Sequence, residues 1–135
     1  MRNALLSHVK RVVVKIGSGV ISNIDGLEED RVAAIAADVC ALQKRGLEVI
    51  LVSSGAVAAG KGQLGIEGRP QTIPQKQAAA AIGQTRITRE YKETFNRHGY
   101  NVAQVLLTRD DLSNRRRYLN TRNTMMTLLE YGVTP

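Results

Sequence analysis

Two apolar segments that each end in a turn of small residues constrain the fold of this chain most strongly. The first runs Arg11-Val-Val-Val-Lys-Ile-Gly-Ser-Gly19, and the second begins at Glu48 and ends in Ser53-Ser54-Gly55. Val and Ile favour strands, and Gly allows the sharp turn by which a buried strand enters a helix. At such turns the first N–H groups of the helix are available to an anion. We therefore predict an α/β protein with anion sites at its strand ends.

The alternation of strand and helix patterns continues along the whole chain. We predict strands over 10–16, 48–53 and 101–107, helices over 28–45, 55–64, 74–98 and 113–131, and loops over 65–72 and 108–112. Apolar strands that do not alternate with polar residues indicate a mainly parallel sheet covered on both faces, a three-layer α/β/α arrangement. Residues 132–135 have the pattern of an approach to a fourth strand. Because three strands make a small and poorly closed sheet, we expect the domain to be incomplete in this chain.

Composition narrows the class of protein. A chain of 135 residues with 43% hydrophobic and 23% charged residues is typical of one soluble globular domain. No run reaches the roughly 18 apolar residues that span a bilayer, and we predict no membrane association. A single cysteine, Cys40, excludes an internal disulfide, and the start of the chain does not read as a signal peptide. We expect a cytoplasmic protein in which Cys40 packs within a helix.

The net charge of +7 leaves nucleic acid, a membrane surface or an anionic small molecule as possible partners. The basic run Arg115-Arg-Arg117 has few aromatic neighbours in a chain with one Phe and four Tyr, so we expect no nucleic-acid surface. His8 and His98 have no ligand partners at metal-site spacing, and we expect no metal bound by the protein itself. An anionic small molecule remains the favoured partner.

Two familiar nucleotide motifs are only approximated. Gly55-Ala-Val-Ala-Ala-Gly-Lys61 satisfies the P-loop spacing, but Gly62 stands where the Mg²⁺-binding hydroxyl belongs, and the Ala-rich middle favours a helix. Gly17-Ser-Gly19 begins like a dinucleotide fingerprint, but Ser22 replaces its third glycine. The second strand then ends in Ser53-Ser54 rather than in an acidic residue for a ribose. We predict neither a P-loop nor a dinucleotide fold.

Three polar positions carry the candidate chemistry. Lys15 interrupts an apolar strand, where an unpaired ammonium would be costly to bury, and an anion is the partner that we expect. The alternative is a lysine that flanks its strand and points to water. Ser54 either caps the helix that Gly55 opens or binds a ligand with the same N–H groups. The run Thr108-Arg-Asp-Asp111 is either a turn or a substrate-facing loop.

Taken together, five segments resemble the amino acid kinase family, and within it the members that phosphorylate the side-chain carboxylate of glutamate. The resemblance covers nearly the whole chain. The segments that carry it are residues 13–22, 52–61, 76–84, 105–112 and 118–122.

This resemblance implies an amino acid kinase-like fold of which residues 1–135 are the N-terminal, substrate-side half, with the nucleotide-binding half absent. It implies ATP-dependent phosphorylation of the L-glutamate γ-carboxylate to L-glutamyl 5-phosphate, the first step of proline biosynthesis. ATP would bring Mg²⁺ with it, proline would act as feedback inhibitor, and the complete enzyme would be a homo-oligomer. We expect the 135-residue chain alone to be inactive.

By the same resemblance, one turn would serve the nucleotide and the other the acceptor. Lys15 would be the catalytic lysine on the transferred phosphate, next to Gly17 and Ser18, whereas glutamate would be bound by Ser54, Gly55 and Ala56. A carboxylate is already nucleophilic, so positioning and charge neutralisation suffice for its phosphorylation. The competing class is a non-enzymatic binding module, which a salt-sensitive affinity for RNA without affinity for glutamate would favour.

Overall fold

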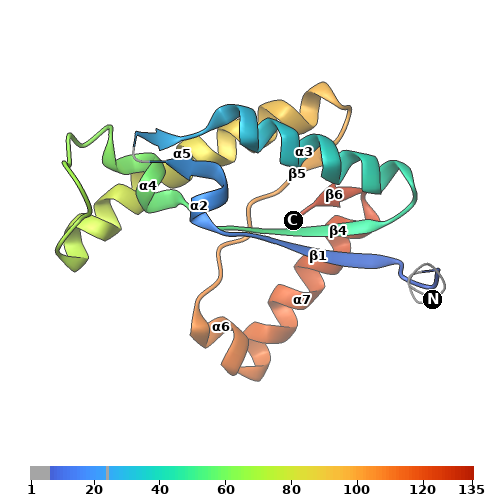
Figure 1. The fold of residues 1–135 in the computed structure, drawn as a ribbon. Helices are drawn as coiled ribbons and strands as arrows, with labels where there is room; N and C mark the ends of the chain where they lie inside the picture. Colours follow the sequence, from blue (N-terminus) through green and yellow to red (C-terminus); the bar gives the residue numbers. More distant parts are fainter. Residues whose placement is uncertain (1–6, 24) are drawn as a thin grey trace.

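The computed structural model describes residues 7–23 and 25–135 (Figure 1). Within them, strands and helices alternate as the sequence predicts, with a short helix and a two-stranded hairpin added after the first strand. The elements in chain order are β1 (Arg11–Ile16), α2 (Ser18–Ile21), β2 (Ser22–Asn23), β3 (Gly26–Leu27), α3 (Glu29–Lys44), β4 (Glu48–Ser53), α4 (Ala56–Lys61), α5 (Ile73–Arg97), β5 (Asn101–Val102), α6 (Arg109–Ser113), α7 (Arg115–Glu130) and β6 (Val133–Thr134).

Two of the three strand pairs in the described residues are parallel, and only the hairpin of β2 and β3 is antiparallel. β1 and β4 pair over six positions, from Arg11 opposite Glu48 to Ile16 opposite Ser53, and β5 pairs with β6. The Leu51 N–H also donates to the Pro135 carbonyl at 3.0 Å, which places β6 beside β4. The strands therefore follow one another across the molecule as β1, β4, β6 and β5, and the approach to a fourth strand predicted over 132–135 is confirmed by β6.

The apolar core lies between β1, β4 and the helices α3 and α5, which run on one side of the strands, whereas α6 and α7 lie on the other (Figure 1). Strand periodicity accounts for this: Val12, Val14 and Ile16 face the core, while Val13 is 63% exposed on the opposite face. Cys40 is buried in α3, as predicted. None of the described helices is long and apolar enough to cross a membrane.

The long helix α5 begins and packs as its sequence predicts. Thr72 accepts a hydrogen bond from the Gln75 N–H, and the Gln75 side chain accepts from the Thr72 N–H, which forms a complete capping box ahead of Pro74. The helical spacing of Ala80, Gly83, Ile87, Tyr91 and Phe95 predicts an apolar stripe, of which Ala80 is half-buried and the other four are buried. Burial of one acidic residue in the same helix, Glu90, raises its pKa.

The segment after β5 differs from the prediction. Only Asn101–Val102 pairs as a strand, and the predicted loop 108–112 contains the helix α6. The reason is a capping box: the Thr108 hydroxyl accepts from the Asp111 N–H, and the Asp111 carboxylate accepts from the Thr108 N–H at 2.7 Å. The Thr108 hydroxyl also donates to the Asp111 carboxylate, at 2.6 Å, and this bond together with the one from the Thr108 N–H lowers the pKa of Asp111. Thr108-Arg-Asp-Asp111 is therefore a helix start.

The last helix, α7, begins later than predicted, and only part of it packs against the strands. Ser113 is the last residue of α6, and Asn114 caps α7 by accepting a hydrogen bond from the Arg117 N–H, so the helix predicted over 113–131 begins at Arg115 instead. Leu129, near the end of the helix, is buried, whereas Leu119, near its start, is 42% exposed. Only the C-terminal end of α7 packs against the strands.

Helices α4 and α5 approach each other so closely that only glycine fits at the crossing. A Cβ atom at Gly60 would overlap the carbonyl oxygen of Ala79, and one at Gly83 would overlap that of Ala56. Because the obstacles are backbone atoms rather than side-chain ends, neither helix can yield without moving as a whole. The two glycines therefore fix the position of α4 on α5.

We expect Gly83→Ala to lower the free energy of unfolding by about 3 kcal/mol, the upper range for overpacking a core. Urea unfolding followed by far-ultraviolet circular dichroism measures this loss. Gly19→Ala is the matched control, because a Cβ there meets no atom within 4 Å, and alanine favours the helix by about 0.5–1 kcal/mol. Equal stabilities of the two variants would contradict the close approach.

Candidate functional site

The two turns predicted to bind anions meet at one edge of the strands. The Ser54 N–H donates to the Ile16 carbonyl at 2.9 Å, so the chain leaves β1 and β4 at adjacent points. Helices α2 and α4 start there, next to each other in Figure 1. Carboxyl ends of parallel strands are where α/β sheets bind their ligands. The structure thus brings the turn at Gly17 and Ser18 beside the turn at Ser54.

Gly55 connects the two turns through packing. Its φ of +104° is a conformation that side-chain-bearing residues rarely adopt, and a Cβ there would lie 3.2 Å from the Ile21 side chain. Ile21, the last residue of α2, is fully buried. The start of α4 therefore rests directly on the end of α2, and the backbone at Gly55 and Ala56 is held in place relative to Gly17 and Ser18.

Lys15 lies in a different environment from the one that the sequence suggests. Its side chain is exposed, on the strand face opposite to the buried Ile16 and in register with the exposed Val52. The expected cost of burying its ammonium is absent, so that argument for an anionic partner is wrong. None of the ion pairs found in residues 7–23 and 25–135 uses Lys15. Its ammonium is open to a ligand arriving from solvent near the two turns.

The Ser54 hydroxyl is also exposed, and it does not cap α4. The N-cap of that helix is Gly55, and no side-chain hydrogen bond caps the first turn. The interpretation of Ser54 as a simple helix cap is therefore wrong. Ser54, Gly55 and Ala56 present one hydroxyl and the first N–H groups of α4 at the same edge, an arrangement that can accept a carboxylate.

A hydrogen bond that the sequence did not reveal fixes the end of β4. The Ser53 hydroxyl donates to the Ser54 carbonyl at 3.2 Å and lies 3.1 Å from the Tyr91 hydroxyl, which can donate to it. Burial of Tyr91 raises the pKa of its phenol, and the bond with Ser53 opposes that rise. Tyr91 belongs to the predicted apolar stripe of α5, where an aromatic residue indicates only packing.

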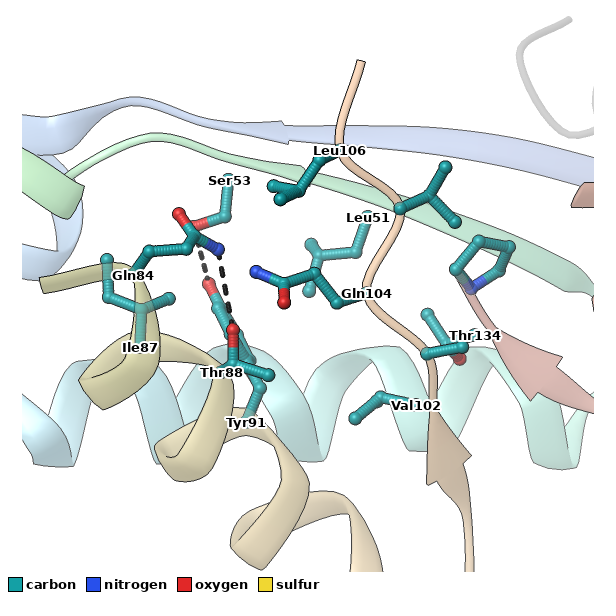
Figure 2. Close-up of a pocket in the computed structure, with 13 residues that line it drawn as sticks. Leu51, Ser53, Gln84, Ile87, Thr88, Tyr91, Val102, Gln104, Leu106 and Thr134 are labelled. Atoms are coloured by element: carbon teal, nitrogen blue, oxygen red, sulfur yellow. Dashed lines mark hydrogen bonds between the residues drawn. The ribbon is translucent and has the colours of Figure 1, made fainter. Parts of the chain in front are cut away.

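Beside this hydrogen bond lies a cavity of about 180 Å³ between β4, α5 and residues 102–106 (Figure 2). Its polar side chains are all uncharged: Gln84 donates to Thr88 at 3.4 Å, and Gln104 points toward the same space. Leu51, Val102 and Leu106 supply apolar lining. No charged side chain therefore lines the cavity to hold a phosphate or a carboxylate.

The described residues contain no group of three or more His, Cys, Asp or Glu side chains that could hold a metal ion. The P-loop alternative is excluded by geometry, because Ala56–Lys61 is the helix α4 rather than a loop around a phosphate. Lys61 lies in the last turn of that helix and donates to the Gly68 carbonyl at 3.4 Å.

The bond between Ser53 and Tyr91 can be measured by a double-mutant cycle. We expect Tyr91→Phe and Ser53→Ala each to lower the free energy of unfolding by about 0.5–1.5 kcal/mol, and the double variant to cost less than the sum. Tyr118→Phe, at a tyrosine that is 46% exposed, is the control and should change nothing. Strictly additive losses would show that the two hydroxyls do not interact.

Comparison with known proteins agrees with this geometry. Residues 10–135 match the amino acid kinase family. The chain belongs to this family.

Among curated proteins, the chain is 64% identical over 135 residues to the glutamate 5-kinase of Syntrophotalea carbinolica and 60% identical over 136 aligned residues to that of Geobacter metallireducens. It is 47% identical to the glutamate 5-kinase of Desulfotalea psychrophila. Each alignment covers 100% of this chain but 36% of the relative. The chain thus spans about a third of the length of these relatives.

Proposed function

We propose that this chain is the acceptor-binding part of a glutamate 5-kinase, which transfers the γ-phosphoryl group of ATP to the γ-carboxylate of L-glutamate and forms L-glutamyl 5-phosphate. One observation carries the proposal: the Ser54–Ile16 hydrogen bond brings a lysine-bearing turn and a hydroxyl-bearing turn to the same sheet edge. The 64% identity to the S. carbinolica enzyme supports the choice of glutamate as acceptor.

In this proposal each of the two turns binds a different substrate. Ser54 and the backbone at Gly55 and Ala56 bind glutamate, while Lys15 and the backbone at Gly17 and Ser18 face the phosphates of ATP. A glutamate γ-carboxylate oxygen attacks the γ-phosphorus as the bond from that phosphorus to the departing ADP oxygen breaks. No proton is transferred, so no general base is required, and positioning with charge neutralisation supplies the catalysis.

Mg²⁺ would accompany ATP and offset the charge of its phosphates. The described residues offer no carboxylate cluster for it, which fits a cation held by the nucleotide rather than by this part of the protein. We further propose that residues 1–135 are the N-terminal half of one three-layer amino acid kinase domain, and that the nucleotide-binding half lies in the remaining length of the relatives. We also propose that proline inhibits the complete enzyme, that this enzyme is a homo-oligomer, and that it is cytoplasmic.

The function is tested in a chimera in which this chain replaces the matching third of the S. carbinolica enzyme. A coupled assay measures ADP release with ATP, Mg²⁺ and glutamate. We expect glutamate-dependent turnover from the chimera and none from the 135-residue chain, because only one side of the transferred phosphoryl group is supplied here. A chimera that folds but releases no ADP in the presence of glutamate would refute the proposed activity.

In the chimera, Lys15→Ala should lower kcat by about 10²–10³-fold, the scale for losing one preorganised group that stabilises charge in the transition state. Lys10→Ala is the matched control and should leave kcat unchanged, because Lys10 is exposed and lies just before β1, at the end of the strand opposite to Lys15. Normal turnover by Lys15→Ala would remove Lys15 from the mechanism.

Ser54→Ala should act on glutamate rather than on ATP. Since one hydrogen bond to a charged ligand contributes about 1.5–3 kcal/mol, KM for glutamate should rise by roughly 10–150-fold while KM for ATP stays constant. Initial rates at varied glutamate and at varied ATP separate the two constants. An equal rise in both would mean that Ser54 supports the whole edge and does not bind the acceptor.

A further inference from the structure

Two hydroxyl groups, on Tyr91 and Ser53, form consecutive hydrogen bonds that end on the backbone of the turn at Ser54 (Figure 2). A serine hydroxyl carries one proton, and Ser53 donates it to the Ser54 carbonyl at 3.2 Å. The Tyr91 hydroxyl, 3.1 Å from the Ser53 oxygen, is therefore the donor in the other bond. Burial raises the pKa of Tyr91, so its phenol keeps the proton that it donates. We call these two bonds the Tyr91–Ser53 relay.

The relay ends on the peptide group that also carries the Gly55 N–H. A trans peptide group is planar, and its C=O and N–H point in opposite directions. Holding the Ser54 carbonyl against the Ser53 hydroxyl therefore directs the Gly55 N–H away from Ser53. Gly55 is buried, yet none of the hydrogen bonds between described residues uses its N–H. Because buried N–H groups are almost always paired, this one is suited to donate to a ligand.

Tyr91 is the fixed member of the relay, and Ser53 is the adjustable one. Tyr91 is 6% exposed, and its ring contacts that of Phe95 edge-on, with 6.5 Å between the ring centroids. Ser53 is exposed at the end of β4, where its side chain has three staggered rotamers to choose from. The bond from Tyr91 selects the rotamer in which the Ser53 hydroxyl reaches the Ser54 carbonyl.

We infer that Tyr91 is a positioning residue for the acceptor: through Ser53 it fixes the direction of the Gly55 N–H, which donates to a carboxylate of glutamate. Tyr91 does not touch the substrate and acts only through Ser53. Its contribution concerns glutamate rather than ATP, because the proposed phosphate contacts lie on the other turn, at Gly17 and Ser18. This inference rests on the proposed function.

Steady-state kinetics of the chimera test the role of Tyr91. We expect Tyr91→Phe to raise KM for glutamate by about 2–10-fold, the range for one neutral hydrogen bond, while KM for ATP stays constant. The double variant Tyr91→Phe/Ser53→Ala should match Ser53→Ala alone, because Tyr91 acts only through Ser53. Ser53→Thr keeps the hydroxyl and should keep KM for glutamate near its original value.

Two controls separate positioning from a general loss of stability. Val39 is buried in α3 and has no polar side-chain atom, so Val39→Ala should lower the unfolding midpoint and leave KM for glutamate unchanged. Tyr131→Phe removes a hydroxyl from a tyrosine that is 79% exposed and should change neither quantity. Should Tyr91→Phe reduce the amount of folded chimera, Ser53→Ala interrupts the same relay at an exposed residue.

An active chimera in which Tyr91→Phe leaves KM for glutamate unchanged would overturn the inference. An equal rise in KM for ATP would also overturn it, as would additive effects of Tyr91→Phe and Ser53→Ala. A chimera that folds but shows no glutamate-dependent ADP release would instead refute the proposed function, and the relay would lose its role with it.

Discussion

The contact between Gly60 and Gly83 is the constraint on which the candidate site depends. No side-chain hydrogen bond caps the first turn of α4, and a helix of six residues has little stability of its own. Its place is set by backbone-to-backbone packing on the much longer α5, which a capping box anchors at Thr72. Because Ser54 and Gly55 lead into α4, the geometry of the turn at Ser54 follows from a helix crossing formed by glycine and backbone atoms.

The crossing of α4 and α5 also fixes the turn at Gly17 and Ser18, through two contacts. Gly55 rests on Ile21, and Ser54 N–H bonds to the Ile16 carbonyl. Ser53 adds a third tie, to Tyr91 on α5. The phosphoryl transfer that we propose needs its two partners held in line, and small displacements lower the rate of such a reaction steeply. The positions of Gly17 and Ser54 are thus fixed by one set of packed elements rather than by two flexible loops.

The sequence predicts well where local chemistry decides the structure, and poorly where neighbours decide it. The β-branched runs at Val12 and Val49 predict strands, and the sequence after Thr72 predicts a helix. The structure contains all three elements. The strand predicted over 101–107 pairs only at Asn101–Val102, because pairing depends on a neighbour and not on the apolar residues alone. Likewise, the bond between Ser53 and Tyr91 joins residues 38 positions apart, which no local pattern encodes.

Lys15 shows how far the strength of a site depends on its surroundings. Two unit charges about 4 Å apart interact by about 1 kcal/mol in water but by about 4 kcal/mol at the effective dielectric constant near 20 of a protein environment. Lys15 shares its strand face with Val13 and Val52, which are 63% and 47% exposed, so in this chain its ammonium is surrounded by water. A rate contribution of about 10²–10³ needs about 2.7–4 kcal/mol. Only the interaction at the lower dielectric constant, near 20, is that strong. The catalytic strength proposed for Lys15 therefore requires that this face be covered, so the residue and the polypeptide that covers it act as one unit.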